Sequence, residues 1–388
     1  MNEPLGGVLI DRTCPPDQLD AWLNEAESLP SLEADDSLIL DLEKIANGTF
    51  SPLKGFMGSA DTASVLESMH LISGHPWTIP IVLHTDDATA AKCSVGSRCA
   101  IRSHQDNEVV ATIEVEEIYE FDRDAFISNV FRTSDPAHPG VGQVLKWGAT
   151  LIAGPITLLR TSKSLIPDGY DLSPRAVREA IADRGWKTIV GFQTRNLGHR
   201  AHEHLQKTAL EQVDGLLIHP LIGWKKPGDM MPDVILEGYE LLMDQYFVRS
   251  NVMLSALTTA MRYAGPREAV FHAIIRKNFG CTHFIIGRDH AGVGDYYGKY
   301  DGHELARELG GELGIDVMCL HGPCFCFRCG TPVTEHTCPH VDEWQQVSGT
   351  QVRAMVGRGE RPPESFMRPE IADFLIEKSK AGQVFFEG

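Results

Sequence analysis

The sequence lacks several features that would assign it at once to a large class of proteins. No run approaches the roughly 18 consecutive apolar residues that a membrane-spanning helix needs. The first residues contain no basic segment followed by an apolar core, as a secretory signal would. No G-x-x-x-x-G-K-[S/T] phosphate loop, internal repeat or low-complexity tract occurs. We therefore expect a cytoplasmic protein with no membrane partner, whose nucleotide site, if it has one, is not of the P-loop kind.

An excess of basic residues is also missing. Lys and Arg number 35 against 53 Asp and Glu, which gives a net charge of −18. Nucleic acids and anionic membrane surfaces need a basic face, so we expect neither as a partner. The apolar fraction of 43% and the charged fraction of 23% are ordinary for a globular protein, and 388 residues suffice for two or three domains. Such an acidic chain can bind anions only where it gathers its cations locally.

The densest group of cations and hydrogen-bond donors lies in residues 193–202, Gln-Thr-Arg-Asn-Leu-Gly-His-Arg-Ala-His. The apolar run 187–192 predicts a buried strand before it, and residues 199–215 predict a helix after it. His199 and His202 would share a face at the amino-terminal end of that helix, where free N–H groups favour anions. Arg195 and Asn196 would converge on the same volume. The segment is typical of a polyphosphate site, although an isolated H-x-x-H pair is more often a solvated helix start.

A second segment supports the first. Residues 287–294, Gly-Arg-Asp-His-Ala-Gly-Val-Gly, follow another strand-like run at 282–286. The glycines let the backbone approach a ligand closely, and Arg288 and His290 add polar groups that Asp289 could orient, or Asp289 could support a metal ion through water. Because ligands of open α/β sheets bind at the carboxyl ends of strands, we expect the two segments to meet at one site.

These two segments and three others resemble the ATP sulfurylase (sulfate adenylyltransferase) family. Residues 44–58 (Lys-Ile-Ala-Asn-Gly-Thr-Phe-Ser-Pro-Leu-Lys-Gly-Phe-Met-Gly) resemble its amino-terminal signature, residues 261–269 (Met-Arg-Tyr-Ala-Gly-Pro-Arg-Glu-Ala) precede the glycine loop as in its members, and residues 348–353 (Ser-Gly-Thr-Gln-Val-Arg) resemble its closing element. The resemblance covers nearly the whole chain. One departure is Leu197, where the family usually has a proline that would fix φ and stiffen the loop.

The pattern of elements predicts an α/β fold. Residues 6–161 mix short helices with partly alternating runs such as 109–115, which predicts a β-rich domain; the resemblance implies a PUA-like barrel. A helix is predicted from Ser173 as N-cap and Pro174 to Gly185. Apolar strand candidates at 187–192, 215–219, 251–255, 282–286 and 315–319 alternate with helical patterns, which predicts a parallel sheet. By resemblance this is a Rossmann-like nucleotidyltransferase domain. We expect domains at 1–164 (PUA-like), 165–322 (catalytic) and 323–388 (small, with a Cys/His cluster and two helices).

Five of the nine cysteines fall between Cys319 and Cys338, which favours a metal over disulfides. The pattern Cys326-x₂-Cys329-x₈-Cys338-x-His340 supplies three thiolates and an imidazole, a set suited to tetrahedral Zn²⁺. The zinc-containing bacterial ATP sulfurylases have a similar run. His336 or Cys324 could replace His340, and reduced cysteines without metal are an alternative. Four protein ligands leave no open position, so we expect a structural role.

The resemblance implies the reversible reaction of MgATP with sulfate to give adenylyl sulfate and pyrophosphate, by direct in-line attack of sulfate on the α-phosphorus. It implies that sulfate is held by Gln193, Arg195 and Ala291. It implies that ATP is held by Gln193, Thr194, Arg195, Asn196, His199, His202, Gly287, Arg288, Asp289 and His290. The catalytic residues would be Thr194, Arg195, Asn196 and Arg288. The family also implies a homo-oligomer, with a dimer expected, and the missing phosphate loop argues against a fused adenylyl-sulfate kinase.

Two other functions remain open on the sequence alone. One is a nucleotidyltransferase with a different acceptor, and the other is a zinc- or redox-responsive nucleotide-binding protein.

Ser348 and Gln351 predict a capping box that starts a helix, and Arg353 would then point to the nucleotide or to solvent, with a structural role favoured. Lys225 and Lys226 lie in a predicted loop that either attracts anions or forms a solvated turn.

Overall fold

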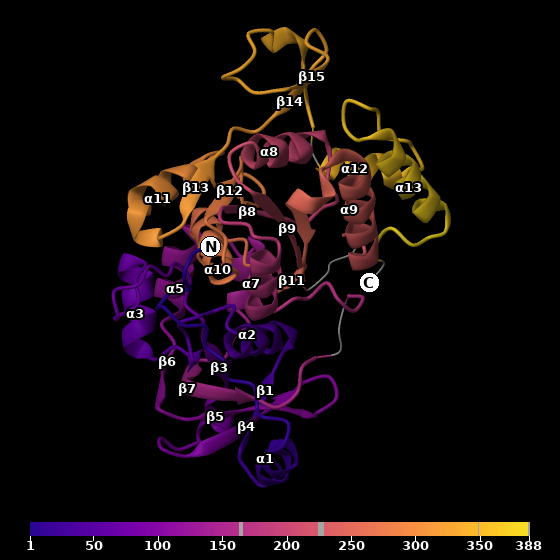
Figure 1. Cartoon of the computed structure of the whole chain (residues 1–388). Helices are drawn as coiled ribbons and strands as arrows, with labels where there is room; N and C mark the ends of the chain where they lie inside the picture. Colours follow the sequence, from indigo (N-terminus) through magenta and orange to yellow (C-terminus); the bar gives the residue numbers. More distant parts are fainter. Residues whose placement is uncertain (163–165, 224–228, 348, 387–388) are drawn as a thin grey trace.

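The computed structural model describes residues 1–162, 166–223, 229–347 and 349–386. Two large sheets dominate the molecule (Figure 1), and a small three-stranded sheet protrudes at the top of the view. Lys225, Lys226 and Ser348, about which the sequence made predictions, lie outside the described residues.

The first 158 residues form the predicted β-rich part, in which a seven-stranded sheet has the order β1-β4-β5-β7-β2, with β3 and β6 also paired to β7. Its strands are β1 Ser31–Ala34, β2 Gly55–Phe56, β3 Leu83–Thr85, β4 Arg98–Ser103, β5 Val109–Glu114, β6 Glu117–Glu120 and β7 Thr150–Leu158. Its helices are α1 Leu19–Ala26, α2 Asp36–Ala46, α3 Ser59–Ser68, α4 Asp87–Ala90, α5 Arg123–Phe131 and α6 Pro139–Val144. At Gly154 (φ +145°) strand β7 changes partners, and a Cβ there would lie 1.9 Å from the carbonyl oxygen of Glu114. The glycine therefore permits the bend at which β7 passes from pairing with β6 to pairing with β5.

The central sheet is parallel, as predicted, with the strand order β10-β9-β8-β12-β13. The five strands are β8 Ile189–Thr194, β9 Gly215–Ile222, β10 Val252–Leu254, β12 His283–Ile286 and β13 Asp316–Cys319, and β11 Leu257–Thr258 also pairs with β9. Helix α7 Pro174–Asp183 begins at Ser173, whose hydroxyl accepts the N–H of Ala176, and Gly185 (φ +68°) follows its end. These predictions are confirmed.

The predicted helix at 199–215 is wrong at its end. Helix α8 spans Arg200–Leu210, and Gly215 already begins β9. The reason is Asp214, whose carboxylate accepts the backbone N–H groups of Lys187 and Thr188 at 2.8 and 2.9 Å. That pair of bonds draws residues 211–214 into a turn between the helix and the sheet.

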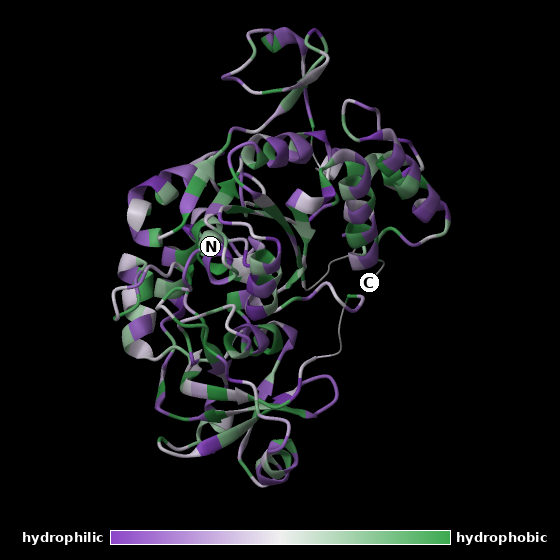
Figure 2. Cartoon of the chain, in the orientation of Figure 1, coloured by the Kyte–Doolittle hydropathy of each residue, from purple (hydrophilic) through white to green (hydrophobic). Residues whose placement is uncertain are grey.

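Side chains on the two faces of the central sheet belong to two apolar cores. Ile189, Leu217 and Phe284 join a core that extends into the β-rich part and includes α7, α10 Pro266–Asn278 and α11 Asp301–Leu309. Val190, Phe192 and Ile285 join the other core, with α8 and α9 Pro232–Tyr246. Figure 2 shows the central strands coloured mainly as hydrophobic. Burial on both faces explains why these strands read as continuous apolar runs.

The carboxyl-terminal part divides in two. Strands β14 Cys324–Cys326, β15 Thr331–Val333 and β16 Trp344–Gln346 form the protruding sheet, which carries the cysteine cluster. Helices α12 Gly349–Gly357 and α13 Pro369–Lys380, the two predicted helices, pack into the core of α8 and α9. Buried Glu203 of α8 accepts two bonds from the Arg368 guanidinium, at 2.9 and 2.6 Å, before α13. This ion pair fixes the end of the chain beside the start of α8.

Among the helices of the described residues, none has both the length and the apolar character required to cross a membrane.

Among the described residues, five histidines are enclosed in the interior: His138, His199, His219, His272 and His303. Burial lowers the pKa of each below its ordinary value. When the pH falls below about 6.5, the unfolded chain therefore binds protons that the folded chain does not. Burial raises the pKa of Asp41 to about 6 and also raises the pKa of Glu268 and of Asp289. These three carboxyl groups bind protons more readily in the folded chain, which opposes the effect of the histidines on stability, but they are fewer.

We predict that the free energy of unfolding decreases as the pH is lowered from 7.5 to 5, by up to about 1.4 kcal/mol per pH unit for each buried histidine. Urea denaturation at several pH values measures it. Replacement of His219 by Gln should reduce the slope by up to one such contribution. An unfolding free energy that stays constant over this range would contradict the prediction.

Candidate functional site

The candidate site lies where the strand order of the central sheet reverses. The chain enters the sheet at β8, adds β9 and β10 on one side, and then returns to add β12 and β13 on the other. Strands β8 and β12 are direct neighbours and run parallel, so the loops that follow them emerge side by side at one edge. Such a reversal leaves a crevice at the carboxyl ends of the strands, where open α/β sheets bind ligands.

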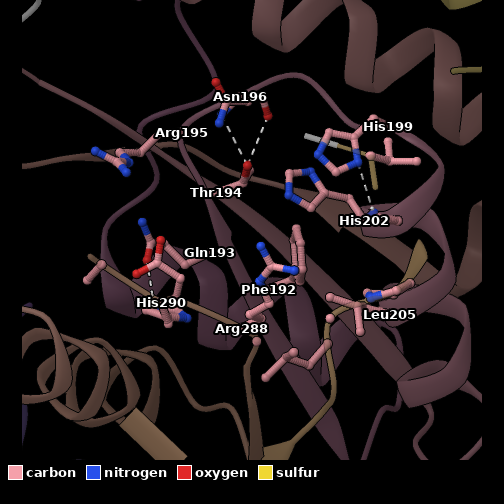
Figure 3. A pocket seen from close by; sticks show the side chains of 18 of the residues that line it. Phe192, Gln193, Thr194, Arg195, Asn196, His199, His202, Leu205, Arg288 and His290 are labelled. Atoms are coloured by element: carbon pink, nitrogen blue, oxygen red, sulfur yellow. Dashed lines mark hydrogen bonds between the residues drawn. The ribbon is translucent and has the colours of Figure 1, made fainter. Parts of the chain in front are cut away.

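A pocket of about 500 Å³ occupies this crevice (Figure 3). Both predicted loops line it, and Arg195 and Arg288 lie among its side chains. Every residue assigned to sulfate or ATP by resemblance lines this pocket: Gln193, Thr194, Arg195, Asn196, His199, His202, Gly287, Arg288, Asp289, His290 and Ala291. The structure therefore brings the two sequence segments together, as expected from their positions after strands.

Thr194 and Leu197 hold the shape of the loop after β8. The Thr194 hydroxyl donates to the carbonyl oxygen of Asn196 at 2.9 Å and accepts its backbone N–H at 3.1 Å. Leu197 is buried in the core of α9, and a Cβ on Gly238 would come within 2.5 Å of its Cδ1. Since Leu197 is anchored by packing, the loop is held without the ring of a proline at this position.

The two histidines of the H-x-x-H pair stack on each other at the start of α8. Their ring centroids are 3.8 Å apart, and His199 is the N-cap residue, its Nδ1 accepting the backbone N–H of His202 at 3.4 Å. Nε2 of His199 therefore carries the ring proton. Burial lowers the pKa of His202 to about 4 and that of His199 well below its ordinary value. Both rings are neutral at pH 7, so the histidines offer N–H groups and the arginines supply the positive charge.

Arg195 reaches the pocket across an aromatic ring. Its guanidinium carbon lies 5.2 Å from the ring centroid of Tyr263, and the side chain is exposed. Tyr263 belongs to the segment 259–265 between β11 and α10, and it adopts φ +60°. The contact with the tyrosine orients the guanidinium at the pocket, where its N–H groups can bind an oxyanion.

The loop after β12 places a second guanidinium opposite the first. Arg288 donates to Oε1 of Gln346 at 2.7 Å, and a Cβ on Gly322 would come within 2.8 Å of the Arg288 side chain. Asp289 and Ala291 adopt φ +52° and +59°. Residues other than glycine in this region are strained, and such strain concentrates at binding sites.

The closing segment of the chain also reaches the pocket, which the sequence did not settle. Gln346, Val347, Thr350 and Gln351 line it, and NH1 of Arg353 donates to Oδ1 of Asn196. Arg353 thus contacts a residue of the site but is not itself among the described residues that line the pocket. A side chain that holds Asn196 in place is consistent with the structural role favoured from the sequence. Because Oδ1 of Asn196 is taken, its amide N–H groups are available to a ligand. Sequence spacing gave no signal that links residues about 150 positions apart.

A buried polar chain stands behind Gln193. Its Oε1 lies 3.1 Å from Nε2 of His290, which in turn lies 3.2 Å from Nδ1 of His272 (Figure 3 draws the first of these bonds). Nε2 of His272 lies 3.5 Å from Oε1 of Glu268. Neither His272 nor Glu268 was assigned a role from the sequence, although Glu268 falls within the segment 261–269 that resembles the family.

The cysteine cluster is separate from this pocket, on the protruding sheet. Nδ1 of His340 lies 3.9, 3.3 and 3.4 Å from the sulfurs of Cys326, Cys329 and Cys338, and the last two sulfurs are 3.6 Å apart. The edges of a tetrahedron with zinc–ligand bonds of about 2.0–2.3 Å measure roughly 3.5–3.8 Å. The four side chains therefore fit a tetrahedral metal ion. The alternative ligand Cys324 instead donates to the carbonyl oxygen of Val333. His336 packs against His321, with the ring centroids 4.0 Å apart.

Comparison with known proteins agrees with this geometry. The family model "ATP-sulfurylase" matches residues 168–378, and that of a "PUA-like domain" matches residues 2–161. The chain is 45% identical over 389 residues to a sulfate adenylyltransferase of Hyperthermus butylicus, covering 100% of this chain and 98% of that protein. It is 46% identical over 375 residues to a sulfate adenylyltransferase of a Synechocystis species, covering 96% of each chain.

Among solved structures, a hexameric APS kinase from Thiobacillus denitrificans has a similar fold. The TM-score is 0.75 at 24% identity, and the match covers 97% of this chain and 68% of that chain. At this identity the similarity concerns the fold alone. The family match over more than half of the residues and the relatives matched over nearly their full length lead to one conclusion: the chain belongs to the ATP-sulfurylase family.

Proposed function

We propose that the pocket between the loops after β8 and β12 transfers the adenylyl group of MgATP to sulfate, giving adenylyl sulfate and pyrophosphate, in a reversible reaction. The observation that carries the proposal is the meeting of Arg195 and Arg288 in one pocket at the strand-order reversal. A guanidinium at each side can hold an oxyanion and a polyphosphate at the same time.

The chemistry needs placement more than proton transfer. Sulfate is a dianion at neutral pH, so the nucleophile requires no general base. The barrier arises from charge repulsion as sulfate approaches the α-phosphorus in line with the leaving pyrophosphate. Arg195, the Gln193 amide and the backbone at Ala291 would hold sulfate. Their positioning and electrostatic stabilisation would supply most of the rate.

The remaining pocket residues would hold the nucleotide. Asn196, His199 and His202 would donate to the triphosphate, and Thr194 would act by shaping their loop, because its hydroxyl is already bonded within it. Gly287 to His290 would line the nucleotide, with Asp289 facing the water around the Mg²⁺ of the substrate. Arg288 would stabilise charge on the phosphoryl oxygens and the leaving pyrophosphate.

We further propose that Cys326, Cys329, Cys338 and His340 hold a structural Zn²⁺. The support is the near-tetrahedral spacing and the backbone N–H of Cys329, which donates to the sulfur of Cys326 at 3.4 Å. The metal would tie β14 to the segment before β16. Pro323 before β14 and Gln346 at the end of β16 both line the pocket, so the zinc module would fix part of its rim.

Three further expectations are retained as proposals. The domain bounds 1–164, 165–322 and 323–388 are proposed on the basis that each part contains its own sheet, although one apolar core joins the first two parts. A cytoplasmic location and a homodimer are also proposed.

The first prediction concerns Arg195. Replacement by Ala should lower kcat/KM for sulfate roughly 30- to 1000-fold, because the dianion loses a charge-assisted partner. This corresponds to a loss of about 2–4 kcal/mol of transition-state stabilisation. The assay is sulfate-dependent exchange between ATP and labelled pyrophosphate. Exchange that runs equally well without sulfate would instead indicate a different acceptor.

Arg184 offers a matched control. It is also exposed and lies over an aromatic ring, 5.5 Å from the ring centroid of Trp186, but it is not among the described residues that line the pocket. Arg184→Ala should retain the exchange rate. An Arg195→Ala enzyme with unaltered use of sulfate would remove the assignment of Arg195.

The second prediction concerns the metal. The purified protein should contain about one zinc ion per chain, and His340→Ala should lose it and melt at a lower temperature, since the fourth ligand is gone. His336→Ala, four residues earlier, should retain both the zinc and the melting temperature. Metal analysis with differential scanning calorimetry measures both. Full zinc content in the His340→Ala variant, or none in the unmodified protein, would contradict the proposed site.

A further inference from the structure

The buried chain behind Gln193 begins at a carboxylate. Glu268, in the first turn of α10, is 1% exposed and accepts the backbone N–H groups of Arg262 and Ala264 at 2.9 and 3.0 Å. His272, one turn later, is also 1% exposed and lies between Glu268 and His290. A buried carboxylate and two imidazoles need a complete set of partners, so their hydrogen bonds are strongly constrained.

The carboxylate determines which nitrogens carry protons. Burial and then the neighbouring Arg276 guanidinium hold the pKa of His272 well below its ordinary value, so this ring is neutral. Nε2 lies 3.5 Å from Oε1 of Glu268, and the negative charge of the carboxylate favours the single N–H at this nitrogen, which leaves Nδ1 as an acceptor. Nε2 of His290 lies 3.2 Å from that acceptor, so it carries the ring proton. The Gln193 amide lies 3.1 Å from the same nitrogen and can share this proton as a second acceptor.

The direction of the Gln193 amide follows from these protons. With an N–H at Nε2 of His290, the favourable orientation of Gln193 turns its oxygen to His290 and leaves its NH₂ group for the pocket. With the opposite tautomer of His290, the amide would turn round and present its oxygen to the pocket. If the Gln193 amide presented an acceptor in place of a donor, the site would favour an oxyanion that carries a proton over one that carries none.

The same carboxylate orients the second group proposed to bind sulfate. Its two bonds to the backbone of Arg262 and Ala264 enclose Tyr263, the ring on which Arg195 stacks. Glu268 thus connects to Arg195 by way of Tyr263, and to Gln193 by way of the two histidines.

A pocket that offers only donors discriminates between oxyanions of similar size. Sulfate has no proton at neutral pH, and all of its oxygens accept hydrogen bonds. Hydrogen phosphate carries an O–H that must find an acceptor or remain unsatisfied on burial, which costs about 1–3 kcal/mol. The amide oxygen of Gln193, if turned inward, would be such an acceptor.

We propose that Glu268, His272 and His290 are positioning residues that lock the Gln193 amide with its NH₂ group toward the pocket, and so make the site select sulfate over hydrogen phosphate. The inference rests on the proposed function, because it takes sulfate as the occupant beside Gln193 and Arg195.

The test is His272→Phe, which preserves ring volume and removes the acceptor behind His290. His272 is not among the described residues lining the pocket, so any effect must be transmitted. The ratio of the phosphate inhibition constant to the KM for sulfate should fall roughly fivefold or more, as expected for one neutral hydrogen bond. The KM for ATP should change less than about twofold. His272→Asn, whose Oδ1 can accept in place of Nδ1, should restore most of the ratio.

Two controls separate positioning from loss of stability. Ile275→Ala removes a buried side chain from the same helix, and it should lower the melting temperature without a change in the ratio. In a Gln193→Ala background, His272→Phe should change the ratio less than about twofold, because the group it positions is gone. An independent effect of the two substitutions would overturn the proposal.

The unmodified protein offers a test that needs no variant. Nitrogen NMR of the imidazoles should find the Nε2–H tautomer at both His272 and His290, and an Nδ1–H tautomer at either would contradict the proposal. If the unmodified enzyme lacks sulfate-dependent exchange, the proposed function fails. If exchange is normal and His272→Phe leaves the ratio unaltered, the positioning role fails while the function stands.

Discussion

The site depends on the reversal of strand order between β8 and β12. Because these neighbours run parallel and their connections leave in opposite directions across the sheet, their loops meet at the carboxyl edge with no intervening strand. Arg195 and Arg288 are about ninety residues apart in the chain, and only this topology brings them into one pocket. An acidic protein can bind two anionic substrates there because Arg195 and Arg288 place two positive charges in one crevice of a chain whose net charge is −18.

Buried contacts prepare the pocket before a ligand arrives. Thr194 closes the loop after β8, Leu197 anchors it in the α9 core, and Tyr263 supports the Arg195 guanidinium. The oxygens of the Gln193 and Asn196 amides are both engaged by protein groups, His290 and Arg353. Their nitrogens are therefore left for the ligand. Donors that are already oriented stabilise developing negative charge without reorganisation, which suits a reaction limited by charge repulsion.

Much of this arrangement was predictable from the sequence, for identifiable reasons. Apolar runs of five or six residues indicated the central strands, because each is buried on both faces. Charged and glycine residues directly after those runs indicated the loops, and the spacing from Cys326 to His340 indicated the metal ligands. The helix from 199 was predicted too long, since propensity does not register that Asp214 bonds to the backbone at 187–188. Arg353, Gln346 and the Glu268–His272 pair were not predicted to act at the site. Their contacts with the site depend on the tertiary structure, and the spacing of polar residues in a helix does not indicate which distant residues they contact.

The central claim is that both loops hold nucleotide and oxyanion together in one pocket. The most direct measurement is a crystal structure with adenylyl sulfate bound. The account predicts the sulfuryl group between Arg195 and the Gln193 amide, the adenosine along residues 287–290, and the phosphoryl group between the two loops. Adenylyl sulfate bound to only one loop, or with Arg195 turned away from the sulfuryl group, would contradict it.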